Sequence, residues 1–167
     1  MDVDLEYAYD DAASAVFSML SNTDFLRARF EATNAVEYEV VECEATADGG
    51  FNIVTTRTVV AEIPGFARKF FKPTTKMTQS EEWKAASGDA REGTWRIEPQ
   101  GVPVSVSTFG TTRLDAANGR TVHRIDAVIK VSVPLVGGKL ERFIFDQAKD
   151  IMDAEYAFGC EWLAARA

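Results

Sequence analysis

The chain has 167 residues, of which 46% are hydrophobic, and its 26 acidic and 18 basic residues give a formal net charge of −8. The apolar content is too high for a disordered chain, and the length fits one domain over residues 1–167. The acidic balance argues against nucleic-acid binding and against adsorption of a broad face to an anionic membrane, because both need a basic surface.

Targeting signals and cysteine content indicate the cellular compartment that we expect. No apolar run approaches the roughly 20 residues that span a bilayer, so we expect no integral membrane segment. The opening residues MDVDLEYAYDD have no basic n-region, and no secretory signal is predicted. Cys43 and Cys160 are too few and too far apart to staple the domain, which favours reduced thiols in the cytoplasm. One histidine and two distant cysteines have no metal-ligand spacing, and we expect neither a metal nor a cofactor.

The chain begins with one predicted strand and two short predicted helices. Apolar and polar residues alternate over residues 3–9, as in a strand with one buried face. The run AASAVFSML predicts a helix over residues 12–20. Asn22 or Thr23 can cap a second helix over residues 24–32.

Six further strands are predicted, because runs rich in β-branched residues alternate with turn signals such as Asp48-Gly49-Gly50 and Asn118-Gly119. The expected strands cover residues 36–45, 51–63, 76–86, 90–98, 102–114 and 120–133. Consecutive strands joined by short turns form an antiparallel meander.

The last thirty residues contain no proline and predict one long amphipathic helix. Its apolar stripe follows three- and four-residue steps through Leu140, Ile144, Ala148, Ile151, Phe158 and Trp162. A helix of roughly 28 residues would be about 42 Å long. The stripe and the apolar face of the sheet can bury each other if the sheet wraps around the helix. We therefore predict an α+β fold, in which a curved antiparallel sheet of about seven strands surrounds a long C-terminal helix.

This order of strand, two helices, six strands and long helix resembles the helix-grip fold of the START-like (SRPBCC) superfamily. Its members include lipid-transfer domains, the birch-pollen allergen family and polyketide cyclases. The junction VSVPLVGGKLE at residues 131–141 is similar to the final strand, turn and helix start of that superfamily. The resemblance covers the whole chain, and we place the chain in an uncharacterised, mainly actinobacterial family.

The resemblance implies a hydrophobic cavity between the long helix and the sheet, gated by the short helices and a loop. The favoured function is binding or carriage of a small hydrophobic or amphipathic ligand, such as a lipid or a polyketide. One alternative is a cyclase or dehydratase acting in the same cavity, and a second is a protein-interaction module with a closed cavity. No catalytic triad, nucleophile elbow or Cys/His pairing is recognisable, so no catalytic residue is named.

Strand alternation selects the residues that would line the cavity. Arg57, Glu81 and His123 are polar groups on otherwise apolar strand faces. A buried charge is costly unless paired, so if these faces are concave, Arg57 and Glu81 could pair and hold the polar end of a ligand. The alternative is a strand bulge that turns these side chains to solvent, or a purely structural pair. The remaining cavity candidates are apolar or aromatic, with core packing as the alternative for most: Trp83, Trp95, Phe109, Ile144, Ala148 and Tyr156.

A cationic and aromatic segment, FARKFFK at residues 66–72, stands out in this acidic chain. It suits a lid over the cavity, a partner contact or a transient membrane contact. The lid candidates are Phe66, Phe70 and Phe71. The alternative is a loop whose rings fill the core while its charges stay in water.

Overall fold

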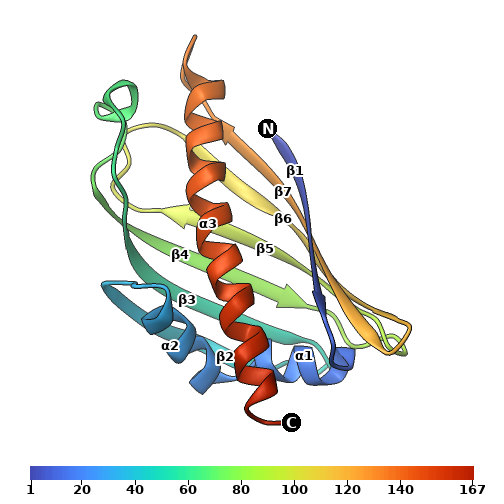
Figure 1. The fold of residues 1–167 in the computed structure, drawn as a ribbon. Helices are drawn as coiled ribbons and strands as arrows, with labels where there is room; N and C mark the ends of the chain where they lie inside the picture. Colours follow the sequence, from blue (N-terminus) through green and yellow to red (C-terminus); the bar gives the residue numbers. More distant parts are fainter.

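The structure, a computed structural model, describes all residues from 1 to 167 and has the predicted α+β architecture (Figure 1). A sheet of seven strands curves around one long helix, and two short helices cover one end of the space between them. The elements are β1 (Asp2–Tyr9), α1 (Ala13–Leu20), α2 (Thr23–Ala32), β2 (Glu37–Ala45), β3 (Phe51–Val60), the 3-10 turn η1 (Gly65–Ala67), β4 (Thr74–Trp83), β5 (Arg91–Pro99), β6 (Val106–Ala117), β7 (Arg120–Val131) and α3 (Gly137–Ala164).

The sheet order is β1-β7-β6-β5-β4-β3-β2, and all neighbouring strands are antiparallel. Strands β2 to β7 form the predicted meander, whereas β1 crosses to pair with β7. The tight turn between β6 and β7 has positive φ angles at Asn118 and Gly119. Such angles suit Asn-Gly, whose twist matches the flanking strands.

Most predicted boundaries agree with the structure within three residues. The clearest difference lies at β6, which begins at Val106 rather than at residue 102. Pro103 has no N–H to donate to a sheet ladder, so the segment before Val106 stays outside the sheet. At α2 the cap is Asn22, whose side-chain oxygen accepts a hydrogen bond from the backbone N–H of Phe25 at 3.0 Å.

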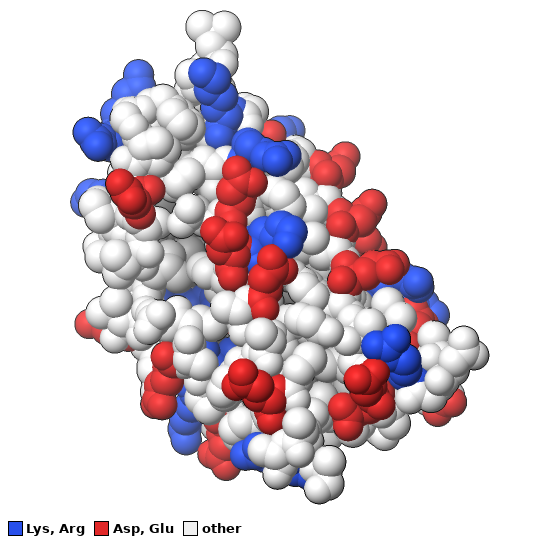
Figure 2. Space-filling view, in the orientation of Figure 1, with Lys and Arg blue, Asp and Glu red and all other residues white.

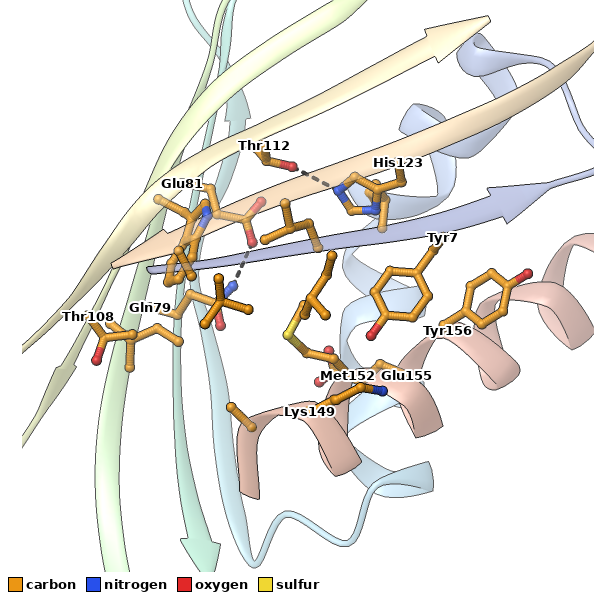
Figure 3. A pocket seen from close by; sticks show the side chains of 18 of the residues that line it. Tyr7, Gln79, Glu81, Thr108, Thr112, His123, Lys149, Met152, Glu155 and Tyr156 are labelled. Atoms are coloured by element: carbon orange, nitrogen blue, oxygen red, sulfur yellow. Dashed lines mark hydrogen bonds between the residues drawn. The ribbon is translucent and has the colours of Figure 1, made fainter. Parts of the chain in front are cut away.

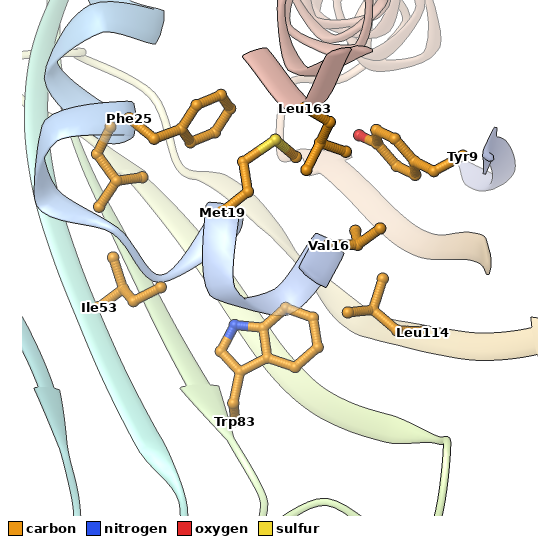
Figure 4. Close-up of a cluster of buried hydrophobic side chains, with 9 residues drawn as sticks. Tyr9, Val16, Met19, Phe25, Ile53, Trp83, Leu114 and Leu163 are labelled. Carbon is orange, nitrogen blue, oxygen red and sulfur yellow. The ribbon is translucent and has the colours of Figure 1, made fainter. Parts of the chain in front are cut away.

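The long helix packs on the concave face of the sheet through two apolar clusters near its ends. The C-terminal cluster has nine buried residues and includes α1 residues inserted between sheet and helix (Figure 4): Tyr9, Val16, Met19, Phe25, Leu26, Ile53, Trp83, Leu114 and Leu163. The N-terminal cluster joins α3 to the η1 segment and the end of β7: Ile63, Ala67, Val131 and Leu140. Between the two clusters the middle of α3 lies over the concave face of the sheet, and residues of α1 and α2 border the space between them.

Candidate functional site

A cavity of about 160 Å³ lies between the middle of α3 and the concave face of the sheet (Figure 3). Of its 25 lining residues, 16 are hydrophobic, so apolar contact dominates. Two small side chains contribute to the open space, since the wall contains Ala127 of β7 on the sheet side and Ala148 of α3 on the helix side. In the sheet register Ala127 lies opposite Gly110. A Cβ atom on Gly110 would lie 1.7 Å from the backbone oxygen of Asp126, so only glycine permits this close approach of the strands.

Side chains alternate between the two faces of the sheet, and this alternation directs several polar residues into the cavity. Figure 3 shows Gln79, Glu81, Thr108, Thr112 and His123 approaching from the sheet, and Lys149, Met152 and Glu155 approaching from α3. Tyr7 of β1 closes the side next to Tyr156, with the two ring centroids 4.9 Å apart.

Two arginines and one glutamate form a charged cluster in the cavity wall. Nη1 of Arg57 donates to Oε1 of Glu155 at 2.7 Å, and Nε of Arg29 lies 3.7 Å from the same oxygen. The side chains of Arg57, Arg29 and Glu155 are 13%, 9% and 16% exposed, respectively. Water therefore screens their charges little. Burial alone raises the pKa of Glu155, but the two arginines outweigh it and hold that pKa below its usual range.

His123, the only histidine, is buried and lines the same cavity as this cluster. Its Nε2 atom shares a hydrogen bond with Oγ1 of Thr112 at 2.8 Å. Burial, assisted by the positive charge of Arg29, lowers the pKa of His123 to about 4. The imidazole is therefore neutral at pH 7, and it can offer a hydrogen bond to a ligand without adding charge.

Glu81 occupies a separate part of the wall. Its two carboxylate oxygens accept hydrogen bonds from Nε2 of Gln79 at 2.8 Å and from Nε1 of Trp83 at 2.9 Å. Near the rim, Asp153 accepts hydrogen bonds from Tyr7 at 2.8 Å and from Lys149 at 2.6 Å. Both acidic groups thus have protein donors.

The structure brings seven of the nine predicted cavity residues to the cavity wall: Arg57, Glu81, Trp83, Trp95, His123, Ala148 and Tyr156. The expected Arg57–Glu81 pair is wrong, since Arg57 pairs with Glu155. Arg57 lies opposite Met77 in the sheet, four residues along β4 from Glu81, which is roughly 13 Å at 3.3 Å per residue.

Two predicted cavity residues lie elsewhere. Phe109 is 44% exposed on the convex face, because Thr108 and Thr112 hold the inward positions of β6 and Phe109 has the opposite parity. Ile144, one turn before Ala148, packs into the N-terminal cluster. Neither is among the lining residues.

The predicted lid segment packs on the N-terminal end of α3. Phe70 and Phe71 are half-buried against the N-terminal cluster, and the ring centroid of Phe71 is 6.2 Å from that of Phe143. Phe66 is 42% exposed. None of the three lid candidates lines the cavity, so a lid role remains a prediction. Figure 2 shows basic side chains gathered at this end of the molecule and acidic ones over much of the remaining face.

Sequence reasoning missed Arg29 and Glu155, although helical spacing contained the signal. Arg29 lies four residues after Phe25 and three after Leu26, on the buried face of α2. Glu155 lies four residues after Ile151 and three before Phe158, in the gap of the apolar stripe of α3. A charged residue at an apolar step of a helix predicts a buried charge.

Two further properties of the whole chain concern metal-ligand clusters and membrane-spanning helices. Nowhere does the chain gather three or more His, Cys, Asp or Glu side chains in a way that could hold a metal ion. None of the helices combines the length and the apolar character needed to cross a membrane.

The fold recurs in solved structures of low sequence identity. TTHA0849 from Thermus thermophilus is 13% identical with a TM-score of 0.68, and the match covers 100% of this chain and 99% of that one. Norcoclaurine synthase from Thalictrum flavum, solved with dopamine and hydroxybenzaldehyde, is 13% identical with a TM-score of 0.60, and the match covers 96% of this chain and 87% of that one. These likenesses confirm the helix-grip fold.

Similarity in sequence points to one family. The uncharacterised protein Rv0481c of Mycobacterium tuberculosis is 25% identical over 170 residues, which cover 96% of this chain and 95% of that protein. The family described as "Protein of unknown function (DUF2505)" matches residues 4–163, nearly the whole chain. The chain therefore belongs to the DUF2505 family, and its own fold is the helix-grip fold.

Proposed function

We propose that this protein binds or carries a small amphipathic molecule in the cavity beneath the middle of α3. The single observation that carries the proposal is the cavity itself, with its 16 hydrophobic lining residues and its few buried polar groups. Apolar burial supplies affinity in such sites, and a few placed polar groups fix the orientation of the ligand.

The cavity size limits the ligand. An apolar cavity of roughly 150 Å³ takes up benzene, and sites for drug-sized ligands measure roughly 300–1,000 Å³. A space of about 160 Å³ therefore suits a molecule of one ring or a short chain rather than a whole lipid. The two ligands named with norcoclaurine synthase are also single-ring molecules, which supports an occupant of this size.

Binding is a better proposal than catalysis. Arg57, Glu81 and His123 line the cavity, so a cyclase or dehydratase would have polar groups to use. A general base works best when its pKa lies near the working pH. The pKa of about 4 makes His123 a weak base at neutral pH. We therefore keep catalysis as the second candidate only.

The interaction-module alternative has less support. Phe70 and Phe71 are half-buried in the N-terminal cluster rather than offered as a contact surface. We also propose a cytoplasmic location, because Cys43 and Cys160 are free thiols.

The test is to fill the cavity. In Ala148→Phe the new ring would occupy the space, and in the matched control Ala154→Phe it would lie on the exposed face of the same helix. We expect NMR titration with toluene, phenol and benzamide to show saturable binding by the unmodified protein and by Ala154→Phe. Binding to Ala148→Phe should fall at least tenfold. If no single-ring probe binds, or if Ala148→Phe binds as well as the control does, the proposed function is wrong.

A further inference from the structure

The guanidinium of Arg29 is a buried cation with no hydrogen-bonded partner. The residue is 8% exposed, its side chain donates no hydrogen bond to any protein atom, and its Nε is the only buried side-chain nitrogen or oxygen atom without a partner. Arginine has five N–H donors, and leaving them unmatched inside a protein is costly. The rings of Phe25 and Phe30, with centroids 5.8 and 5.2 Å from Cζ of Arg29, stabilise the charge but accept no in-plane hydrogen bond.

The cluster around Arg29 lacks one negative charge. Arg29 and Arg57 share Glu155, and both approach the same atom, Oε1. The other charged lining residues are engaged elsewhere, since Lys149 pairs with Asp153, and Glu81 accepts from Gln79 and Trp83. His123 is neutral at pH 7. Two cations therefore face one carboxylate at this part of the wall.

The position of Arg29 is suited to a ligand. Arg29, Arg57, Glu155 and His123 all line the cavity. Nε of Arg29 is itself buried, so the terminal nitrogens Nη1 and Nη2, which also have no hydrogen-bonded partner, are its donors with accessible surface. Arg29 and His123 line the same cavity, and the charge of Arg29 helps to lower the pKa of His123. A planar carboxylate matches the forked donors of a guanidinium, and its single charge would balance the cluster.

We propose that the ligand of this cavity carries a carboxylate, which Arg29 binds inside the protein, so the ligand class is that of small aromatic or short-chain carboxylic acids. This inference rests on the proposed function and adds the chemistry of the polar end. It also gives a reason for retaining a cation at a buried helix position that an apolar residue would fill at lower cost.

Benzoate and benzamide form a matched pair of probes, since they have the same ring and nearly the same shape but differ in charge. We expect benzoate to bind at least about tenfold more tightly, because hydrogen bonds between ionised groups are roughly twice as strong as neutral ones. In Arg29→Met, which keeps an apolar stem and removes the cation, the preference should disappear while benzamide still binds. Affinities are measured by NMR titration at fixed pH and ionic strength.

The single histidine gives a second readout in the unmodified protein, which does not depend on the folding of a variant. A carboxylate beside Arg29 would offset its positive charge, so saturating benzoate should raise the pKa of His123, followed by NMR titration of its ring protons. Benzamide buries the same surface without a charge and should leave the pKa of His123 unraised. Tyr7 lies opposite His123 in the sheet, and the charge of Arg29 acts on this histidine. The other charged or titratable residues that line the same cavity are Tyr9, Arg57, Glu81, Lys149, Glu155 and Tyr156.

The possible outcomes separate the two proposals. If benzamide or toluene binds and benzoate does not, or benzoate and benzamide bind equally, the carboxylate inference is wrong and the proposed function stands. A preference for benzoate that persists in Arg29→Met, or an unchanged pKa of His123, also overturns the inference. If none of the probes binds, the proposed function fails and this inference fails with it.

Discussion

Beneath the C-terminal half of α3 the concave face of the sheet is sealed by apolar side chains, whereas beneath the middle of the same helix it borders a mainly apolar cavity with a few buried polar and charged groups (Figures 3 and 4). In the sealed region α1 lies between sheet and helix and buries Val16 and Met19. In the open region α1 and α2 contribute only wall residues, namely Leu20, Phe25 and Arg29, and the small side chains of Ala127 and Ala148 line the space. One sheet and one helix thus enclose a close-packed core where α1 is inserted between them and a cavity where it is not.

The comparison also separates two kinds of burial. Core residues such as Leu114 and Leu163 gain stability from the apolar surface that they remove from water. Burial removes the favourable hydration free energy of Arg29, Arg57 and Glu155. Their attraction to one another offsets only part of that loss. We infer that the sealed region stabilises the fold and that the open region gives up stability for recognition.

The largest expected effect is that of Glu155→Gln. This change leaves Arg29 and Arg57 without a counter-charge, and breaking a buried ion pair costs about 4 kcal/mol of the free energy of unfolding. Urea denaturation at pH 7 measures the loss, with Glu161→Gln on the exposed face of α3 as the control. A cost for Glu155→Gln below about 1 kcal/mol would indicate that water already screens the arginines.

Truncation of the sealed core comes next. Leu114 is fully buried, and Leu114→Ala should lower the free energy of unfolding by about 3 kcal/mol through lost apolar burial and a new cavity. Ile125→Ala, on the cavity wall, should cost less, about 1–2 kcal/mol, because that side chain already borders open space. Equal costs in urea denaturation would show that the two regions are packed alike.

The open region should also make stability depend on pH. The pKa of His123 is about 4 in the folded chain against an ordinary value near 6.5, so between these values the unfolded chain binds more protons. Stability is therefore complete above about pH 6.5 and decreases as the pH falls toward 4. Between pH 7 and pH 5 the loss is about 2 kcal/mol. In His123→Gln, urea denaturation should show a nearly flat profile over this range, and an unchanged slope would contradict burial of a neutral imidazole.

The spacing of apolar residues and the residues typical of turns made most of the fold predictable from the sequence. Strand alternation placed Arg57, Glu81, Trp83, Trp95 and His123 on the concave face, and the pairing registers agree with it. Alternation assigns a face but cannot assign partners, because a partner depends on where the strands meet α3 across the cavity. The Arg57–Glu81 pair failed for that reason.

The choice of Phe109 failed for a different reason. Size and aromatic character indicated a cavity residue, but β6 places Thr108 and Thr112 inward and leaves Phe109 on the convex face. For Arg29 and Glu155 the helical period carried enough information, since each occupies an apolar step of its helix. The two residues at the centre of the binding proposal were therefore those at which the sequence departs from its own pattern.

The smallest expected change in stability is that of Arg29→Met, and it tests the comparison most directly. An apolar side chain of similar length removes an unmatched buried cation and leaves the 2.7 Å pair between Arg57 and Glu155 in place. Replacing buried charges with apolar groups is often neutral or stabilising, so the free energy of unfolding should stay the same or rise by about 1 kcal/mol. Arg57→Met, which breaks the close pair, should instead lower it. If Arg29→Met loses more than about 2 kcal/mol in urea denaturation, Arg29 stabilises the fold, and the open region does not give up stability for recognition at this position.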